Sequence, residues 1–396
     1  MRLGTTQHHE TTAKHIVREA KTKRLLNNPD VKRWYDNLAR SSAVTARNNL
    51  YRLESFCREH NLTPVSFKDI AVRDLKASMD LMQDHIGMME EKNYAPGYIA
   101  VTISGVQSWL QHFDIRTTRK FSVRNKSSTP TLEGERVPEG QEMVEVYNRA
   151  GLRTGTAISL IAKAGLRPEV LGNYNATDGL MIKDLPDIAI VQGVAVCLQS
   201  PPRIIVRRTL SKARHQYITF LTTQGTRRLL PYLNDRLANN EVLNAESPII
   251  SPNQEYKYGR GANKDKRFLP TSTISDLIRD TLRPRFRWRP YVFRAYFDSW
   301  LLVAENRGKV ARDFRVFWMG HKGTIEGRYT TNKQTLADTM IKEMREAFKR
   351  SEEFLDLEVK EIDPLLKQKE ELHGMIEKAT PEQMQKMFQT LNICNT

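Results

Sequence analysis

The sequence predicts a mainly α-helical protein of more than one domain, in which one domain also holds a small antiparallel sheet. The chain has 396 residues, which as a prior suggests two or three domains rather than one. The stretch Arg124–Gly140 is rich in Ser, Thr, Pro, Gly and charge, as is typical of a linker. Apolar residues recur at helical spacing on both sides of it, and the β-rich stretches all follow it.

The first part of the chain predicts an all-helical domain over residues 28–123. Residues 1–27 are polar and basic without an apolar core, so we expect a flexible segment rather than a secretory signal. Asn28 is the expected cap of the first helix, with Pro29 at its first position. Further helical patterns cover about 44–56, 68–92 and 96–113.

The second domain is predicted over 139–348, after a linker at 124–138. It opens with helical patterns near 139–150 and 154–164. Two β-rich stretches follow, Ile188–Leu198 and Arg203–Thr222. The second holds two alternating runs around the turn-like "LSKAR", which predicts a hairpin, and helical patterns return from about residue 223.

Residues 349–396 predict a C-terminal helical tail. Within "TPEQMQKMFQTL", Thr380 is an expected cap and Gln383 closes a capping box. Two interpretations of this tail are open: it packs on its own body, or it contacts a neighbouring subunit.

The charge balance predicts a polyanionic partner. The net charge is +16 and the isoelectric point about 9.7, which favours nucleic acid first and an anionic membrane surface second. A solvated basic surface is the alternative. No run of eighteen apolar residues is present, so we expect no membrane span. The three scattered cysteines argue against disulfides and zinc, and we expect a cytoplasmic protein without metal or cofactor.

Two basic residues of the second domain are candidates for phosphate chemistry. Arg167 follows a Gly–Leu pair and precedes a proline at a helix end, where its planar fork could grip a phosphate. Lys212 lies on or beside the predicted hairpin turn. It could protonate a leaving oxygen or contact a base, or it could be an ordinary turn lysine.

A third candidate, Arg294, lies inside the apolar run "YVFRAYFDSWLL". A buried charge there needs a partner, either a phosphate or an internal salt bridge with Asp or Glu. Just before it, exposed arginines alternate with Phe286 and Trp288, a pattern that suits a phosphate backbone.

The stretch "MGHKGTIEGRYT" places His321 at an expected helix start, eight residues before Tyr329. Histidine can donate to a phosphoryl oxygen near neutral pH. Tyrosine can attack phosphorus and store the bond energy as a phosphotyrosine ester. Taken alone, Tyr329 would be an ordinary core or surface aromatic.

The order Arg, hairpin Lys, x-x-x-Arg, Gly-His, Tyr resembles the tyrosine recombinase/integrase family over roughly 139–345. "MGHKGTIEGRYT" looks most like the archaeal and archaeal-virus integrases of that family. The resemblance implies a helical core-binding domain and a mixed α+β catalytic domain that close around DNA as a C-shaped clamp. It also implies a virus or other mobile element as the origin.

The resemblance implies a role for each candidate. Arg167 and Arg294 would bind the non-bridging oxygens of the scissile phosphate, and His321 would add a third donor. Lys212 would be the general acid on the 5′ oxygen, and Tyr329 would form a 3′-phosphotyrosyl link. Such charge stabilisation needs no metal, and the chain has no GxxxxGK[ST] loop for ATP.

The chain departs from the family pattern at Tyr291, which stands where the family often has a histidine and is a candidate catalytic residue by that position. A phenol is a poor proton acceptor at neutral pH, so the base that activates Tyr329 is open. Glu169 lies two residues after Arg167, where the family tends to have an acid three after, and receives no role. Tyr291 and Tyr296 are rival tyrosines, which their apolar surroundings predict to be lining or core.

The implied partners are double-stranded DNA at attachment sites and three further copies of the chain, in a tetramer on DNA. An accessory DNA-bending protein is compatible with this. Two alternatives are open: a telomere resolvase or a relaxing type IB topoisomerase with the same residues, and a non-catalytic DNA-binding regulator. The predicted DNA contacts are Arg207, Arg208, Arg214, Arg283, Arg285, Arg287 and Arg289.

Overall fold

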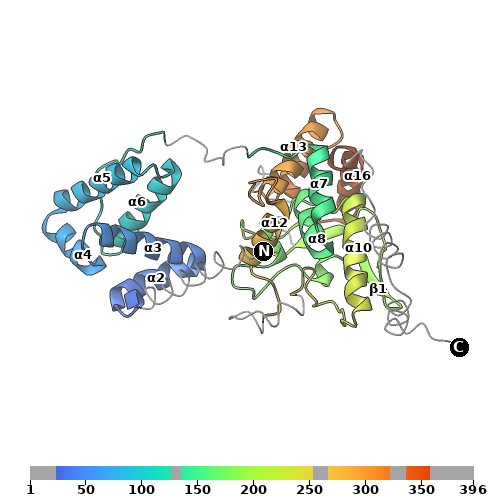
Figure 1. The fold of residues 1–396 in the computed structure, drawn as a ribbon, viewed down its shortest axis with the longest axis horizontal. Helices are drawn as coiled ribbons and strands as arrows, with labels where there is room; N and C mark the ends of the chain where they lie inside the picture. The colour runs from blue at the N-terminus through green and yellow to red at the C-terminus, as the bar shows by residue number, and fades with distance from the viewer. Residues whose placement is uncertain (1–23, 126–134, 253–265, 322–335, 357–396) are drawn as a thin grey trace, which may run out of the picture. The chain divides into compact units, whose positions relative to one another are not determined.

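The computed structural model describes residues 24–125, 135–252, 266–321 and 336–356. The chain divides into two compact units, Met1–Thr131 and Leu132–Thr396 (Figure 1). The division falls inside the stretch 124–138 that the sequence marks as a linker. The described residues are mostly helical, with two small antiparallel sheets, as the sequence predicts.

The described part of the first unit is all helical. Its core joins residues of every helix, among them Trp34, Leu53, Phe67, Ile86 and Trp109, each at most 2% exposed. The helices are α2 (Pro29–Ser41), α3 (Ala43–Glu59), α4 (Pro64–Arg73), α5 (Leu75–Glu91) and α6 (Pro96–Gln111).

Local capping chemistry sets these helix starts. Asn28 caps α2 as predicted, since its side chain accepts hydrogen bonds from the backbone of Asp30 and Val31. The single helical pattern predicted over 68–92 is two helices. Asp74 separates them because its extended backbone ends α4 while its carboxylate caps α5 at Ala77.

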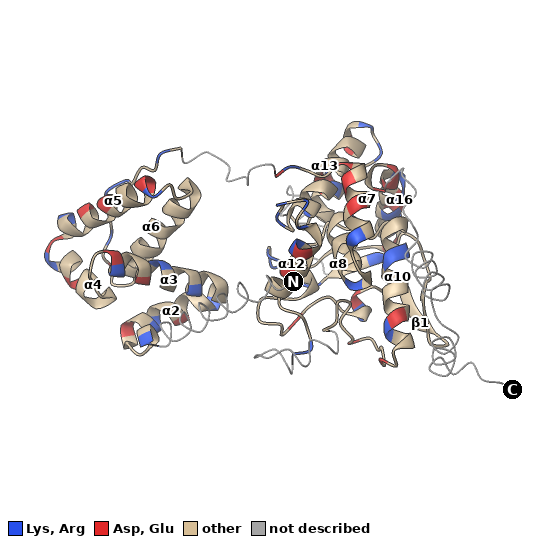
Figure 2. Cartoon of the chain, viewed as in Figure 1, with Lys and Arg blue, Asp and Glu red and all other residues tan. Residues whose placement is uncertain are grey.

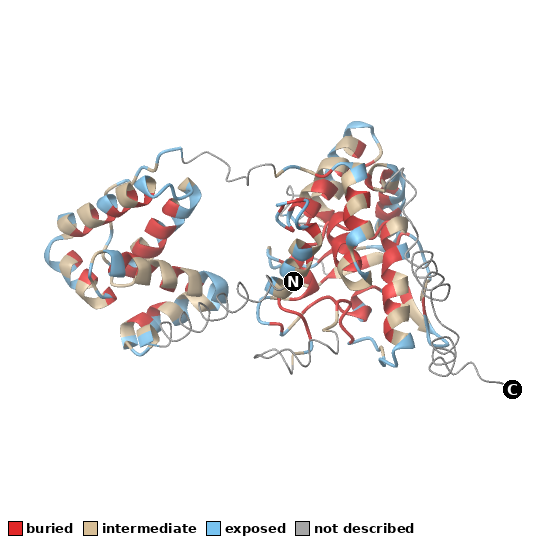
Figure 3. Cartoon of the chain, viewed as in Figure 1, coloured by how far each residue is buried: buried red, intermediate tan, exposed pale blue. Residues whose placement is uncertain are grey.

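The second unit places its helices around α8, which is buried from Gly155 to its last residue (Figure 3). Figure 2 shows lysines and arginines next to acidic residues on the helices of both units. The helices are α7 (Gly140–Arg149), α8 (Leu152–Ala162), α9 (Pro168–Leu171), the 3-10 turn η1 (Ile182–Asp184), α10 (Thr223–Ala238), α12 (Thr271–Leu282), α13 (Val292–Asn306), α14 (Arg312–Trp318) and α16 (Asp338–Leu355).

Both sheets of the second unit are two-stranded hairpins. Strand β1 (Ile188–Val191) pairs with β2 (Val194–Cys197) through a two-residue turn in which both residues have positive φ. Strand β3 (Arg203–Val206) pairs with β4 (Tyr217–Phe220), which confirms the predicted hairpin. The connection 207–216 between β3 and β4 contains Lys212.

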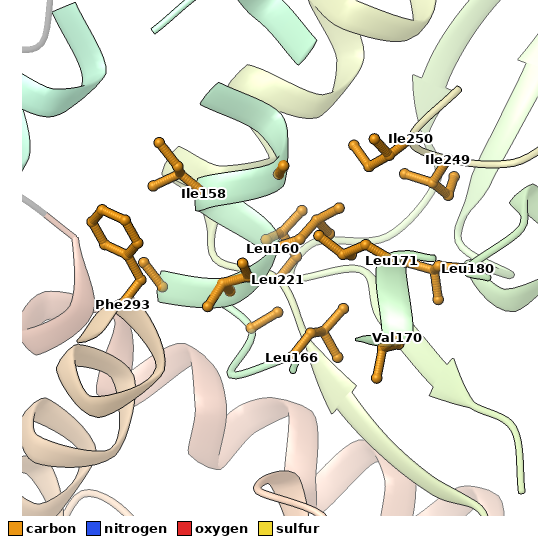
Figure 4. Packing of buried hydrophobic residues seen from close by; sticks show 14 of the residues in the cluster. Ile158, Leu160, Leu166, Val170, Leu171, Leu180, Leu221, Ile249, Ile250 and Phe293 are labelled. Carbon is orange, nitrogen blue, oxygen red and sulfur yellow. The ribbon is translucent and has the colours of Figure 1, made fainter. Parts of the chain in front are cut away.

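The main core of the second unit fixes the backbone around two of the candidate arginines. Leu166 and Phe293, the neighbours of Arg167 and Arg294, are both fully buried in one hydrophobic cluster. Figure 4 shows them with Leu160, Val170 and Leu221 in that cluster. Hydrophobic burial alone does not set a direction for a side chain. Close packing of Leu166 and Phe293, however, restricts the backbone of the adjoining Arg167 and Arg294.

Candidate active site

Arg294 is fully buried in the first turn of α13. Its Nη1 donates to the carbonyl of Gly165, and its Nη2 donates to the carbonyl of Met319 at 2.5 Å. Each carbonyl belongs to the turn that ends a helix, α8 or α14, where the helix dipole favours a cation. In the described part of the chain no Asp or Glu forms an ion pair with Arg294, so the internal salt bridge considered from the sequence is not found there.

Arg167 lies between α8 and α9 and is 9% exposed. Its Nη1 is buried and has no hydrogen-bond partner. Burial, and then the positive charge of Arg167, lower the pKa of Arg294. Two neighbouring buried cations without a carboxylate between them are unfavourable unless an anion joins them. This geometry is suited to a phosphate group.

Two glycines with left-handed backbone shape the turns that Arg294 holds. Gly165 has φ +67°, and a Cβ there would lie 2.4 Å from the Phe297 ring. Gly320 has φ +58°, and a Cβ there would lie 2.5 Å from the ring of Tyr217. A larger residue would therefore displace the turn before Arg167 from Phe297, or the turn before His321 from Tyr217.

His321 follows the end of α14 and is exposed. Gly320 ends the preceding helix, and the helix expected to start at His321 would lie in residues outside those described, so it stays a prediction. Partial burial lowers the pKa of His321, and the charges of Arg294 and Arg167 lower it further. The imidazole is then neutral at pH 7 and has one donor and one acceptor nitrogen. Tyr329 lies outside the described residues.

Lys212 is exposed in the connection between β3 and β4. No hydrogen bond or ion pair joins it to the arginines within the described residues. The structure brings Arg167, Arg294 and His321 into one electrostatic neighbourhood, and the place of Lys212 in the site stays a prediction.

Arg207, the first residue after β3, anchors this connection from inside. Its Nε donates to Asp184 Oδ1 at 2.9 Å, and its Nη2 donates to Asp178 Oδ1 at 2.8 Å and to the carbonyl of Gly179 at 2.7 Å. These partners occupy the guanidinium that the sequence assigned to DNA. We therefore leave Arg207 out of the proposed DNA contacts.

The two rival tyrosines differ. Tyr296 is 2% exposed and its hydroxyl donates to the carbonyl of Leu355 at 3.1 Å, so the core interpretation holds for it. Tyr291 precedes α13 and is 53% exposed, so it is not a core residue, and its alternative role in lining the site stays a prediction. Tyr291 interacts with Arg294 and favours its charged form.

The arginine-rich connection before α13 alternates exposed and buried side chains. Phe286 and Trp288 are buried and stacked, with centroids 4.1 Å apart. Arg285, Arg287 and Arg289, which alternate with these two rings, are exposed, although Arg289 pairs with Glu135 and Arg285 lies 3.7 Å from Glu145. Six of the predicted DNA contacts are thus exposed: Arg208, Arg214, Arg283, Arg285, Arg287 and Arg289.

Tyr217, the first residue of β4, also belongs to this neighbourhood, and the sequence did not single it out. It is 1% exposed, and its hydroxyl lies close to the Arg294 guanidinium but makes no hydrogen bond of good geometry. Burial raises its pKa, and the charges of Arg294 and Arg167 offset part of that rise. Strand alternation indicates only that such a residue faces inward. That it faces two arginines depends on contacts distant in the sequence.

Across the described ranges, no group of three or more His, Cys, Asp or Glu side chains lies together as a metal site would require. Among the helices described, none is long and apolar enough to cross a bilayer.

Comparisons with known proteins found similarity only at the level of solved structures. No protein family and no curated protein matches the sequence. The XerA recombinase matches with 19% identity and a TM-score of 0.33, over 80% of this chain and 97% of that one. The XerH site-specific recombinase bound to difH substrate matches with 15% identity and a TM-score of 0.33, over 61% of this chain and 63% of that one. XerH in a post-cleavage complex matches with 12% identity and a TM-score of 0.39, over 77% of this chain and 78% of that one. Similarity this distant assigns no activity to this chain.

Proposed function

We propose that this chain is a site-specific DNA recombinase that breaks and rejoins duplex DNA through Tyr329. One observation supports this above all: Arg167 and Arg294 are buried together, have unpaired nitrogens and form no ion pair within the described residues. A fold that retains such a pair gains stability when an anion binds it. A phosphodiester fits, because its two non-bridging oxygens can each accept from a guanidinium.

In the proposed reaction Tyr329 Oη attacks the scissile phosphorus. A bond forms between phosphorus and the tyrosine oxygen while the bond to the 5′ oxygen breaks, and Lys212 supplies that oxygen with a proton. The two arginines stabilise the charge that grows on the non-bridging oxygens. His321, neutral at pH 7, can donate to the phosphate or accept the proton of Tyr329.

Recombination needs two cleavages at each of two sites, so we propose a tetramer on DNA. The two units would both contact the duplex, with the exposed arginines before α13 on the phosphate backbone. The tail after α16 is the proposed contact between subunits.

The test is covalent trapping. The protein is mixed with duplexes from the DNA that flanks its own coding region, each with a nick that releases a short fragment after cleavage. Denaturing gels should show a protein–DNA band that is absent with Tyr329→Phe and present with the control Tyr296→Phe, which changes the rival tyrosine of the core. A band that survives Tyr329→Phe would contradict the proposal.

The remaining outcomes separate the alternatives. Relaxation of supercoiled plasmid without a defined site would favour the topoisomerase. Tight DNA binding with no covalent band from any duplex, including a randomised library, would favour the non-catalytic regulator.

A further inference from the structure

The Tyr217 hydroxyl is a buried polar group whose burial has no structural explanation within the fold. The ring is 1% exposed and its hydroxyl proton has no acceptor; the Arg294 guanidinium approaches the oxygen, but only as a donor and outside good hydrogen-bond geometry. A buried hydroxyl without a partner destabilises the folded state, so most buried tyrosines find one. Tyr296 in the same unit is an example, since its hydroxyl donates to the carbonyl of Leu355 at 3.1 Å.

The hydroxyl end of Tyr217 lies at the turn that carries His321. A Cβ on Gly320 would lie 2.5 Å from Cε1 and 2.6 Å from Cζ of the Tyr217 ring, and Cζ is the atom that carries the hydroxyl. Arg294 holds the same turn from its other side by donating to the carbonyl of Met319. The ring of Tyr217, at the start of β4, is therefore held against this turn, next to Arg294.

The unpaired polar atoms of this neighbourhood form a set. Arg167 Nη1, Arg294 Nε and Tyr217 Oη are all buried and all lack a hydrogen-bond partner. Glu169 is the acid whose charge reaches Tyr217, but within the described residues it forms no ion pair with either arginine. Three donors without an acceptor fit an anion with several oxygens.

We propose that Tyr217 is a further catalytic residue, whose hydroxyl donates a hydrogen bond to a non-bridging oxygen of the phosphate held by Arg167 and Arg294. This inference rests on the proposed function for its catalytic part, but the binding of an inorganic anion tests it independently.

The state of the phenol agrees with a donor role. Burial raises the pKa of Tyr217, so the hydroxyl keeps its proton at neutral pH. A protonated phenol can donate to a phosphate oxygen, but it is a poor nucleophile and a poor base. Tyr217 is thereby distinguished from Tyr329, which must lose its proton to react.

The first arm of the test compares stability with anion binding. Tyr217→Phe removes an unpaired hydroxyl and keeps the ring, so the free variant should melt at the same temperature as the wild type or a few degrees higher. Inorganic phosphate, added at constant ionic strength, should raise the Tm of the variant less than that of the wild type. The control Tyr296→Phe loses a paired hydroxyl, so it should melt lower and keep the full response to phosphate.

The second arm measures cleavage on a duplex that the wild type traps. Loss of one donor to the growing charge should slow covalent adduct formation by about 100-fold, as for other single oxyanion donors. Replacing one non-bridging oxygen at a time by sulfur should slow the wild type at the oxygen that Tyr217 contacts. The variant should not show that difference.

The outcomes separate the two proposals. A Tyr217→Phe protein with a lower Tm and an unchanged response to phosphate would overturn the role of Tyr217, as would cleavage at the wild-type rate. If the wild type forms no adduct, the proposed function fails, and the phosphate arm still decides whether Tyr217 belongs to the anion site.

Discussion

Arg167 and Arg294 are both buried, yet the fold compensates their charges differently. Arg294 has two backbone carbonyls as partners, whereas Arg167 retains an unpaired Nη1. Each guanidinium also repels the other, which is why the charge of Arg167 lowers the pKa of Arg294. We therefore expect Arg294 to stabilise the fold as well as to serve the proposed site, and Arg167 to destabilise the free protein.

This difference predicts opposite effects on stability and on chemistry for Arg167→Met, which removes the charge and keeps most of the side-chain volume. Covalent adduct formation should fall by about 100-fold or more, because a donor to the transition state is lost. The free energy of unfolding without DNA should not fall, because a repulsive charge is removed. Denaturant melts measure the stability and trapping assays measure adduct formation. Arg350→Ala, at an exposed position on α16, is the control. A clear loss of stability would contradict this account of Arg167.

In the first unit, His85 predicts a pH dependence of stability. It is 3% exposed, its Nδ1 has no partner, and its ring lies 5.3 Å from that of His60. Burial lowers its pKa from 6.5 to about 4, and the charge of His60 contributes; Glu59 raises it and Lys92 lowers it slightly. The unfolded chain then binds the proton more readily than the folded one.

Stability should therefore fall as the pH drops from about 6.5 to about 4, by up to about 3 kcal/mol. Urea melts of the wild type across this range measure it. In His85→Leu the melts should depend less on pH over the same range. An equal dependence in that variant would assign the effect to other groups.

At the scale of elements, the hairpin of β3 and β4 carries both the proposed phosphate donor Tyr217 and the proposed general acid Lys212. Tyr217 opens β4 within the arginine neighbourhood, and Lys212 lies in the connection before it. Arg207 holds the start of that connection to Asp178 and Asp184. Arg207 is thus placed to position Lys212 rather than to contact DNA.

Arg207→Ala should accordingly reduce cleavage of ordinary DNA but not of a substrate with sulfur in place of the 5′ bridging oxygen. A thiolate leaves without a proton, so that substrate does not need the general acid. Lys212→Ala should show the same rescue, and Arg207→Lys should recover only part of the activity because one nitrogen cannot replace the fork. If sulfur rescues Lys212→Ala alone, Arg207 has a merely structural role.

The sequence predicts best the features that local chemistry decides. Asn28 with Pro29 starts α2 as expected, because a cap acts on its own first turn. Asp74 was missed as a boundary because apolar spacing continues through it. The pairing of Arg207 with Asp178, and the approach of Tyr217 to Arg294, join residues far apart in the chain. No local pattern shows such contacts.

The net charge of +16 belongs to the whole molecule and predicts salt-sensitive DNA binding. For a duplex without a recombination site, the logarithm of the binding constant should fall linearly with the logarithm of the salt concentration. Each of Arg283→Ala, Arg285→Ala and Arg287→Ala should reduce the slope by about one. Fluorescence anisotropy over a salt series measures this, with Arg350→Ala as control. Unchanged slopes would remove the connection before α13 from the DNA surface.

The tail beyond α16 bears on assembly. Truncation before Glu361 should leave covalent adduct formation largely intact, because the proposed site residues all precede it, and should abolish complete recombination. Trapping gels and a two-site recombination assay measure the two activities. Full recombination by the truncated protein would show that subunits assemble without the tail.

The two ways in which the fold compensates its buried arginines also predict how related chains diverge. A descendant that loses catalysis is still under selection to fold, and Arg294 ties the turns at Gly165 and Met319 together. Position 294 should therefore remain arginine by inheritance even in inactive copies. The unpaired atoms of Arg167 and Tyr217 only destabilise a protein that binds no phosphate, so mutation should erode these two positions first. In an alignment of relatives, Arg167 and Tyr217 would then distinguish working enzymes from inactive descendants, and Arg294 would not.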